Sequence, residues 1–184
     1  NITINNITMM DVIACPIYLT TGERERGPDA TTPSRMRNIF ISNVIASGID
    51  PMSGIQITGT PGQPIEGVRL ENIRLDFKGG GTKAQAARVP RELGIGYPEP
   101  SRIGVMPAYG VFARHVRGLE LANVSLSFAS DDLRPAMVCS DVDGLEVDNF
   151  KAQLTSGVPA AVLADNVRGI TIRNSPVLDG ITTK

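Results

Sequence analysis

Pro64-Ile65-Glu66-Gly67-Val68-Arg69-Leu70-Glu71-Asn72-Ile73 is the stretch that decides the fold, because its pattern returns along the whole chain. It is a short strand in which apolar and polar residues alternate and which ends on an asparagine. The same pattern stands upstream at residues 2–7 and 37–44, and downstream at residues 118–124, 144–150 and 169–174. The chain is therefore built from repeats of one strand type.

The turn asparagines are spaced at intervals of 37, 29, 51, 26 and 25 residues, at Asn6, Asn43, Asn72, Asn123, Asn149 and Asn174. A period in the twenties, with strands and no helical pattern, is typical of a solenoid whose units bury their apolar residues by stacking. A second short strand stands in each period, at residues 15–19, 54–57, 110–113, 135–139 and 160–164. We therefore predict an all-β fold, a parallel β-helix of about six coils forming one domain over residues 1–184.

Alternation predicts which side chains face the core, since successive strand residues point to opposite sides. The expected inward set is Ile39, Ile41, Val44, Val68, Leu70, Ile73, Leu119, Leu121, Val124, Leu145, Val147, Phe150, Ile170 and Ile172. The charged residues between them, Arg69, Glu71, Glu120, Glu146, Asp148 and Arg173, are expected to face solvent. Asparagine tolerates a left-handed backbone, so we expect the turn asparagines to stand in single file and bond to one another.

Two intervals exceed the bare period and place insertions at about residues 21–35 and 78–107. The second insertion contains a helix-forming run capped by Thr82 and then a proline-rich run. Loops of this length in a compact domain are usually functional or disordered.

The charge balance excludes global attraction to nucleic acid or to an anionic membrane, since 18 Lys and Arg face 19 Asp and Glu. No apolar run approaches the roughly 20 residues of a membrane span. Cys15 and Cys139 lie in different repeats and are expected to be buried thiols without a disulfide.

Several strings, taken with the repeat, resemble the C-terminal part of bacterial family 28 glycoside hydrolases, the polygalacturonase-like pectin enzymes. They stand at residues 1–6, 24–28, 59–66, 97–101, 107–110 and 132–136, so the likeness covers nearly the whole chain. The resemblance implies a right-handed parallel β-helix and a secreted or periplasmic enzyme without a cofactor. It also implies inverting hydrolysis of galacturonate-containing polysaccharide, in which one carboxylic acid protonates the leaving oxygen and a carboxylate activates water.

The chain departs from the family at the catalytic strings. The family carries Asn-Thr-Asp, Asp-Asp, Gly-His-Gly-like and Arg-Ile-Lys strings, of which only a bare Asp-Asp occurs here. We therefore predict no catalytic residue in this chain and expect it to be an inactive C-terminal portion whose catalytic acids lie upstream. Its first repeat is expected to need a cover for Ile2, Ile4 and Ile7, from upstream coils or another chain.

The bare pair Asp131-Asp132 is interpreted as a solvated corner near Arg134, and His115 as a turn histidine between strands. The single histidine has no Cys or acidic partner at ligand spacing, so no metal site is predicted.

Substrate contacts are predicted at Arg24, Arg26, Tyr97, Glu99 and Tyr109. Guanidinium groups pair bidentately with carboxylates such as those of galacturonate, and the resemblance puts the Arg24 and Arg26 loop beside the cleft, with Arg35 and Arg37 in support. The tyrosines offer a ring or a hydroxyl to a sugar. A structural interpretation stays open for each: pairing of the arginines with Glu23, Glu25 and Asp29, and loop packing for the others.

Two other function classes also stay open. One is a noncatalytic carbohydrate-binding or adhesion β-helix, and the other is a purely structural solenoid. A structural solenoid predicts regular coils, so the two insertions argue against it.

Overall fold

The computed structural model describes residues 1–24, 35–51, 54–179 and 182–183. Its elements in chain order are β1 (Ile2–Met10), β2 (Tyr18–Thr20), β3 (Arg37–Ile49), β4 (Ile55–Thr58), β5 (Ile65–Gly79), α1 (Lys83–Ala86), α2 (Pro100–Ile103), β6 (Val111–Ser130), β7 (Met137–Ala152), β8 (Val162–Arg173), the 3-10 helix η1 (Pro176–Leu178) and β9 (Thr182–Thr183). The described part of the chain is mostly β, which confirms the all-β prediction.

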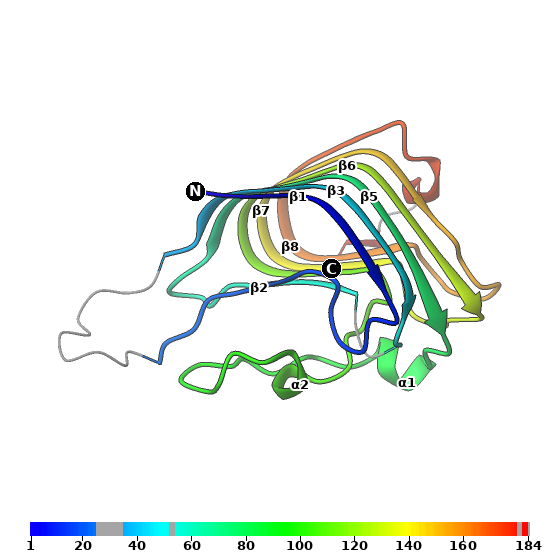
Figure 1. Cartoon of the computed structure of the whole chain (residues 1–184), viewed down its shortest axis with the longest axis horizontal. Coiled ribbons are helices and arrows are strands. Elements are labelled where there is room, and N and C mark those ends of the chain that lie inside the picture. Colours follow the sequence, from blue (N-terminus) through cyan, green and yellow to red (C-terminus); the bar gives the residue numbers. More distant parts are fainter. Residues whose placement is uncertain (25–34, 52–53, 180–181, 184) are drawn as a thin grey trace.

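The strands form one sheet in the order β1-β3-β5-β6-β7-β8-β9, and every pair of these strands is parallel. The short strands β2 and β4 pair with each other, and β4 also pairs with the beginning of β6. Figure 1 shows the long strands as bent ribbons stacked one behind another, with α1 and α2 on one side of the stack. Parallel pairing places like residues of successive repeats next to one another.

The predicted inward residues of β3, β5, β6 and β7 form the core, since all twelve lie at 3% exposure or below. Those of β8 are different, because Ile170 and Ile172 are only partly buried. The next strand, β9, pairs only with Leu163 and Ala164, so no described strand covers this part of β8. The inward prediction is therefore confirmed in the middle of the stack and only partly met at its last strand.

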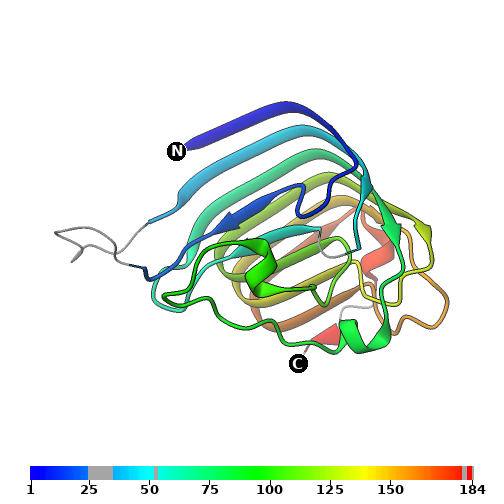
Figure 2. The same cartoon turned by 60° about the horizontal axis from the view of Figure 1, so that its bottom comes forward.

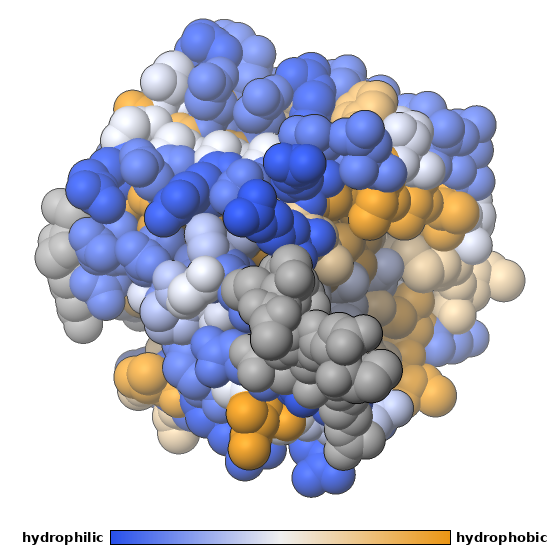
Figure 3. Space-filling view, turned by 90° about the vertical axis from the view of Figure 1, so that its left-hand side faces the viewer, coloured by the Kyte–Doolittle hydropathy of each residue, from blue (hydrophilic) through white to orange (hydrophobic). Residues whose placement is uncertain are grey.

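Ile2, Ile4 and Ile7 on β1 are 40%, 40% and 36% exposed. Within the described ranges β1 pairs only with β3, so its other edge has no partner. Figure 3 shows the molecule from the left-hand side of Figure 1, and most of this face is hydrophilic. Apolar side chains gather toward its right-hand margin, which is the front of Figure 1, where β1 lies.

A ladder of asparagine amides bends the stack at one corner. The Nδ2 of Asn43, Asn72, Asn123 and Asn149 each donates to the Oδ1 of the asparagine one repeat earlier, at 3.0, 2.9, 3.0 and 2.7 Å. All five asparagines of the ladder have a φ between 52° and 58°. The ladder prediction is confirmed for these residues.

The last rung of the ladder differs from the prediction. Asn174 has the same left-handed backbone, but its Nδ2 donates to Asp148 Oδ1 at 2.8 Å instead of to Asn149. A carboxylate is a stronger acceptor than an amide oxygen, so the neighbouring Asp148 takes the bond.

A second corner column stands five residues before the ladder. It begins with Asn38, whose Nδ2 donates to Asn1 Oδ1 at 2.8 Å, and continues through Gly67, Gly118, Gly144 and Gly169, all with positive φ. A Cβ on Gly169 would lie 3.4 Å from the Cα of Gly144, so these glycines stack closely. Glycine serves there because it alone takes the left-handed backbone at no steric cost.

Cys139 is buried as predicted, and burial raises the pKa of its thiol to about 12. Cys15 is only half-buried, because it precedes β2 at the uncovered end of the stack. Neither forms a disulfide.

Leu121→Ala is expected to lower the free energy of unfolding by about 2–5 kcal/mol, because it leaves a cavity between Leu70 and Val147, its register neighbours. Urea unfolding followed by circular dichroism measures the change. Ser125→Ala, on the exposed face of the same strand, is the control and should stay within about 0.5 kcal/mol of the parent. Equal effects would contradict the assignment of the core face.

Asn123→Ala is expected to cost about 2–4 kcal/mol, since it loses two ladder bonds and puts a Cβ into a left-handed backbone. Asn123→Gly loses the same bonds but keeps the backbone unstrained, so it should cost about 1–2 kcal/mol less than the alanine variant. The same unfolding measurement compares the two. A glycine variant as unstable as the alanine variant would show that the amide bonds alone select asparagine.

Candidate functional site

The segment between β5 and β6 folds back over the outer face of the short strands (Figure 2). It begins about two residues later than predicted, because β5 continues to Gly79. Lys78 of this strand forms an ion pair with Asp50 at 2.6 Å. The predicted cap is confirmed: the Thr82 side chain accepts from Gln85 N, and the Gln85 side chain accepts from Thr82 N. Ile103 and Met106 of this segment pack on Phe112 of β6, with Tyr18 and Val138 at the margin.

A buried ion pair holds both ends of this segment. Asp132 Oδ2 accepts from Arg134 Nη2 at 2.7 Å and from Gly81 N at 3.0 Å, while Arg134 Nη1 donates to Met106 O at 3.4 Å. The side chains of Asp132 and Arg134 are 0% and 1% exposed. A Cβ on Gly81 would lie 2.1 Å from Asp132 Oδ1, so only glycine fits there. The expected solvated corner was wrong for Asp132, although Arg134 is its neighbour as predicted.

Arg114 holds the middle of the segment. Its Nη1 donates to Pro90 O at 2.5 Å and its Nη2 to Arg91 O at 2.9 Å, and its Nε lies 3.1 Å from Glu92 Oε1. The residue is 7% exposed, and this burial lowers its pKa, an effect that Glu92 opposes. Arg114 is thus a structural clamp between β6 and the insertion.

His115 has a left-handed backbone with a φ of 53°, as expected of a turn residue, but it lies within β6 and not between two strands as predicted. Its Nδ1 lies 2.6 Å from Asp141 Oδ2 and its Nε2 lies 3.0 Å from Glu92 Oε1. Sequence spacing missed these acidic partners, because Asp141 comes from the next repeat and Glu92 from the insertion. No three His, Cys, Asp or Glu side chains of the described residues form a group that could hold a metal ion.

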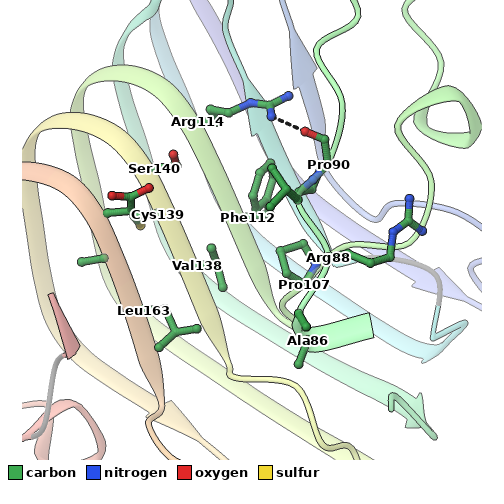
Figure 4. Close-up of a pocket in the computed structure, with 14 residues that line it drawn as sticks. Ala86, Arg88, Pro90, Pro107, Phe112, Arg114, Val138, Cys139, Ser140 and Leu163 are labelled. Atoms are coloured by element: carbon green, nitrogen blue, oxygen red, sulfur yellow. Dashed lines mark hydrogen bonds between the residues drawn. The ribbon is translucent and has the colours of Figure 1, made fainter. Parts of the chain in front are cut away.

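An open groove of about 210 Å³ lies between this segment and the outer face of β6, β7 and β8. Phe112, Val138 and Leu163, which are register neighbours, form its apolar floor (Figure 4). Arg88 stands on the insertion side, and Ser140 and Asp165 on the strand side. The groove can hold a ligand with an apolar face and a polar edge, but it holds no group set up for acid/base or nucleophilic chemistry.

Sequence reasoning missed these floor residues, although a signal for them existed. Phe112, Val138 and Leu163 alternate with inward residues such as Ala113 and Cys139, so both faces of these strands are apolar. A strand with two apolar faces indicates that something covers the outer face.

The structure brings together two of the predicted substrate contacts. The guanidinium of Arg24 lies 4.3 Å from the ring centroid of Tyr97, an arrangement typical of a cation–π contact. Tyr97 is 52% exposed. Glu99 is exposed at the N-cap of α2. Burial raises the pKa of the Tyr18 hydroxyl, and the negative charge of Glu99 raises it further by a smaller amount. Arg26 lies outside the described residues.

Tyr109 is a core residue, so its predicted contact with substrate was wrong. It is 0% exposed, and its hydroxyl donates to Gln153 O at 2.7 Å. Its ring meets those of Phe77 and Phe128 edge to face at centroid distances of 5.4 and 5.2 Å. Burial raises the pKa of the Tyr109 hydroxyl, with a smaller contribution from Asp132.

Comparison of the chain with known proteins finds no matching family model, no matching curated protein and no matching solved structure. The resemblance to family 28 glycoside hydrolases therefore stays a prediction. In the described residues no helix has both the length and the apolar character needed to span a membrane.

Arg114→Ala is expected to free the middle of the insertion, so amide exchange over residues 88–94 should become at least about tenfold faster, because two bonds to a charged donor are lost. Hydrogen–deuterium exchange with mass spectrometry measures this. Arg88→Ala, which removes an arginine that donates to no described carbonyl, is the control. Unchanged exchange in Arg114→Ala would contradict the clamp role.

Proposed function

We propose that the chain is a right-handed parallel β-helix belonging to a polygalacturonase-like glycoside hydrolase. Three features support a β-helix: the repeat of about 25 residues, the parallel pairing from β1 to β8 with one register shift after Ala46, and the columns of left-handed corner residues. They suit a chain that winds through equivalent passes.

The proposed role is to bind pectin-type polysaccharide, while inverting hydrolysis is carried out by acids outside this chain. The observation that carries the proposal is the groove beside the insertion, with an apolar floor in which Val138 and Leu163 are partly open and Phe112 is covered. The C–H face of a sugar ring suits such a floor, and Arg88, Ser140 and Asp165 supply groups for its hydroxyls. A polysaccharide substrate places the protein outside the cytoplasm, in the periplasm or secreted.

Asp131-Asp132, the one pair of adjacent acids in the sequence, does not supply the two carboxyl groups of inverting hydrolysis. Inverting hydrolysis needs two carboxyl groups about 6.5–9.5 Å apart that both reach the substrate. Asp132 is 0% exposed and bound to Arg134, so the pair cannot act on a sugar. The same observation favours the second candidate, a noncatalytic carbohydrate-binding β-helix.

A covering partner at β1 is also part of the proposal. Ile4, Ile7, Met9 and Ile17 line an apolar hollow of about 280 Å³ at this end of the stack. Asn6 accepts from Asn43 but donates to no described residue. A further parallel pass, from the same protein or from another chain, fits both features because it continues the strand register and the ladder.

Purified protein is expected to bind polygalacturonate without releasing reducing sugar. Affinity gel electrophoresis measures the binding and a reducing-sugar assay the turnover. Leu163→Asp should abolish binding, because it puts a charge on the groove floor. Leu154→Asp, the same change at a 38% exposed leucine outside the groove, is the control.

Release of reducing sugar by the purified chain would contradict the proposal that the catalytic acids lie outside this chain. Loss of binding in both aspartate variants would mean that the groove is not the site.

A further inference from the structure

Three arginines gather at a second hollow, which shares no lining residue with the groove. Arg35, Arg37 and Arg117 line it together with Glu66, Met36 and residues 61–64, and it measures about 280 Å³. Three arginines and one glutamate thus line the hollow. The hollow is polar and positively charged in a protein whose overall charge is close to neutral.

The parallel register explains why these side chains meet. In the strand register Arg37 lies opposite Glu66, and Glu66 lies opposite Arg117, so the three residues stand side by side on three adjacent strands. Neighbouring strands lie about 4.8 Å apart, which puts the backbones of Arg37 and Arg117 roughly 10 Å from each other. All three side chains are exposed.

These arginines have no ion-pair partner within the described ranges. Elsewhere on the surface Arg69 pairs with Glu71 and Glu120 at 3.0 and 2.5 Å, and Arg173 pairs with Glu146 at 3.7 Å. Glu66 stands between Arg37 and Arg117, yet no ion pair within 4.0 Å joins it to either one. No carboxylate of the described residues therefore occupies the hydrogen-bond donors of these guanidinium groups.

The wall of the hollow is held in place by buried contacts. Thr60 N donates to Gln63 O at 3.2 Å, and Gln63 N donates to Thr60 O at 3.0 Å, which closes a tight turn. Thr21, at 5% exposure, donates its hydroxyl to Gln63 O at 2.6 Å and accepts from Thr60 N at 3.2 Å. Glu66 N donates to Met36 O at 3.0 Å. The hollow is thus largely preformed, which lowers the entropic cost of binding.

We propose that this arginine pocket binds the carboxylate of a uronate residue in an acidic polysaccharide, as a subsite separate from the groove. Guanidinium is suited to this ligand because its planar fork donates two parallel bonds to one carboxylate. This inference rests on the proposed function and deepens it: the groove takes the apolar face of one sugar, and the pocket selects an acidic sugar.

The test is isothermal titration calorimetry with trigalacturonate and with its fully methyl-esterified form. The variant is Arg37→Gln with Arg117→Gln, and the control is Arg74→Gln with Arg102→Gln. The control removes two exposed arginines outside both sites, neither of which is ion-paired with a described residue. Thermal unfolding checks that both variants are folded.

Trigalacturonate should bind the pocket variant at least about tenfold more weakly than the parent, because a charge-assisted bidentate pair is lost. The control should stay within about twofold. The methyl ester should bind the parent and the pocket variant equally, since it has no carboxylate to recognise.

Equal weakening in both double variants would overturn the pocket, because it would show general attraction to positive charge. An unchanged affinity in the pocket variant, together with lost binding in Leu163→Asp, would overturn the pocket and leave the proposed function standing. A parent that binds dextran sulfate but not trigalacturonate would overturn the uronate assignment and the proposed function together.

Discussion

The parallel register is the constraint on which the rest of the structure depends. Each strand buries every second side chain, so a slip of one residue would turn its whole apolar set to solvent. From β5 to β7 no such slip occurs, and residues such as Leu70, Leu121 and Val147 lie directly on one another. Between β3 and β5 the register shifts by one residue between Ala46 and Ile49, at the end of β3. Left-handed residues at the corners keep this register, because they make every pass turn at the same place. The asparagine amides add a directional bond to each turn.

The insertion between β5 and β6 is anchored to the strand stack by buried polar side chains. Its ends are held by Asp132 and Arg134, and its middle by Arg114. The Asp132–Arg134 pair is fully buried, so the cost of desolvating it is offset only because Gly81 N, Arg134 N and Met106 O also bond to it. This arrangement covers Phe112 but leaves Val138 and Leu163 partly open. The groove is therefore the uncovered remainder of an apolar outer face.

The two hollows differ in chemistry, because they lie over different columns of outward-facing residues. Apolar residues stand at three successive positions of one column, Phe112, Val138 and Leu163, and charged residues repeat in the column that begins with Arg37. In a parallel stack a single position of the repeat thus sets the character of a whole strip of surface. An extended ligand such as a polysaccharide suits such strips, since it can meet several repeats at once.

The sequence by itself determined the strand repeat, the inward residues of four strands, the asparagine ladder up to Asn149 and the helix capped by Thr82. These features are local or periodic, so alternation and turn chemistry are enough to predict them. Tertiary structure alone decided that Tyr109 and Asp132 are buried, that His115 lies between two carboxylates, and that Arg117 joins Arg35 and Arg37. These outcomes depend on contacts between residues that are at least 23 positions apart, such as His115 and Glu92, and 51 positions apart for Asp132 and Gly81. Which residues meet depends on how long the insertion between two repeats is. The tertiary structure decided them because burial and charge pairing follow from what stacks above and below a residue, and a single strand does not carry that information.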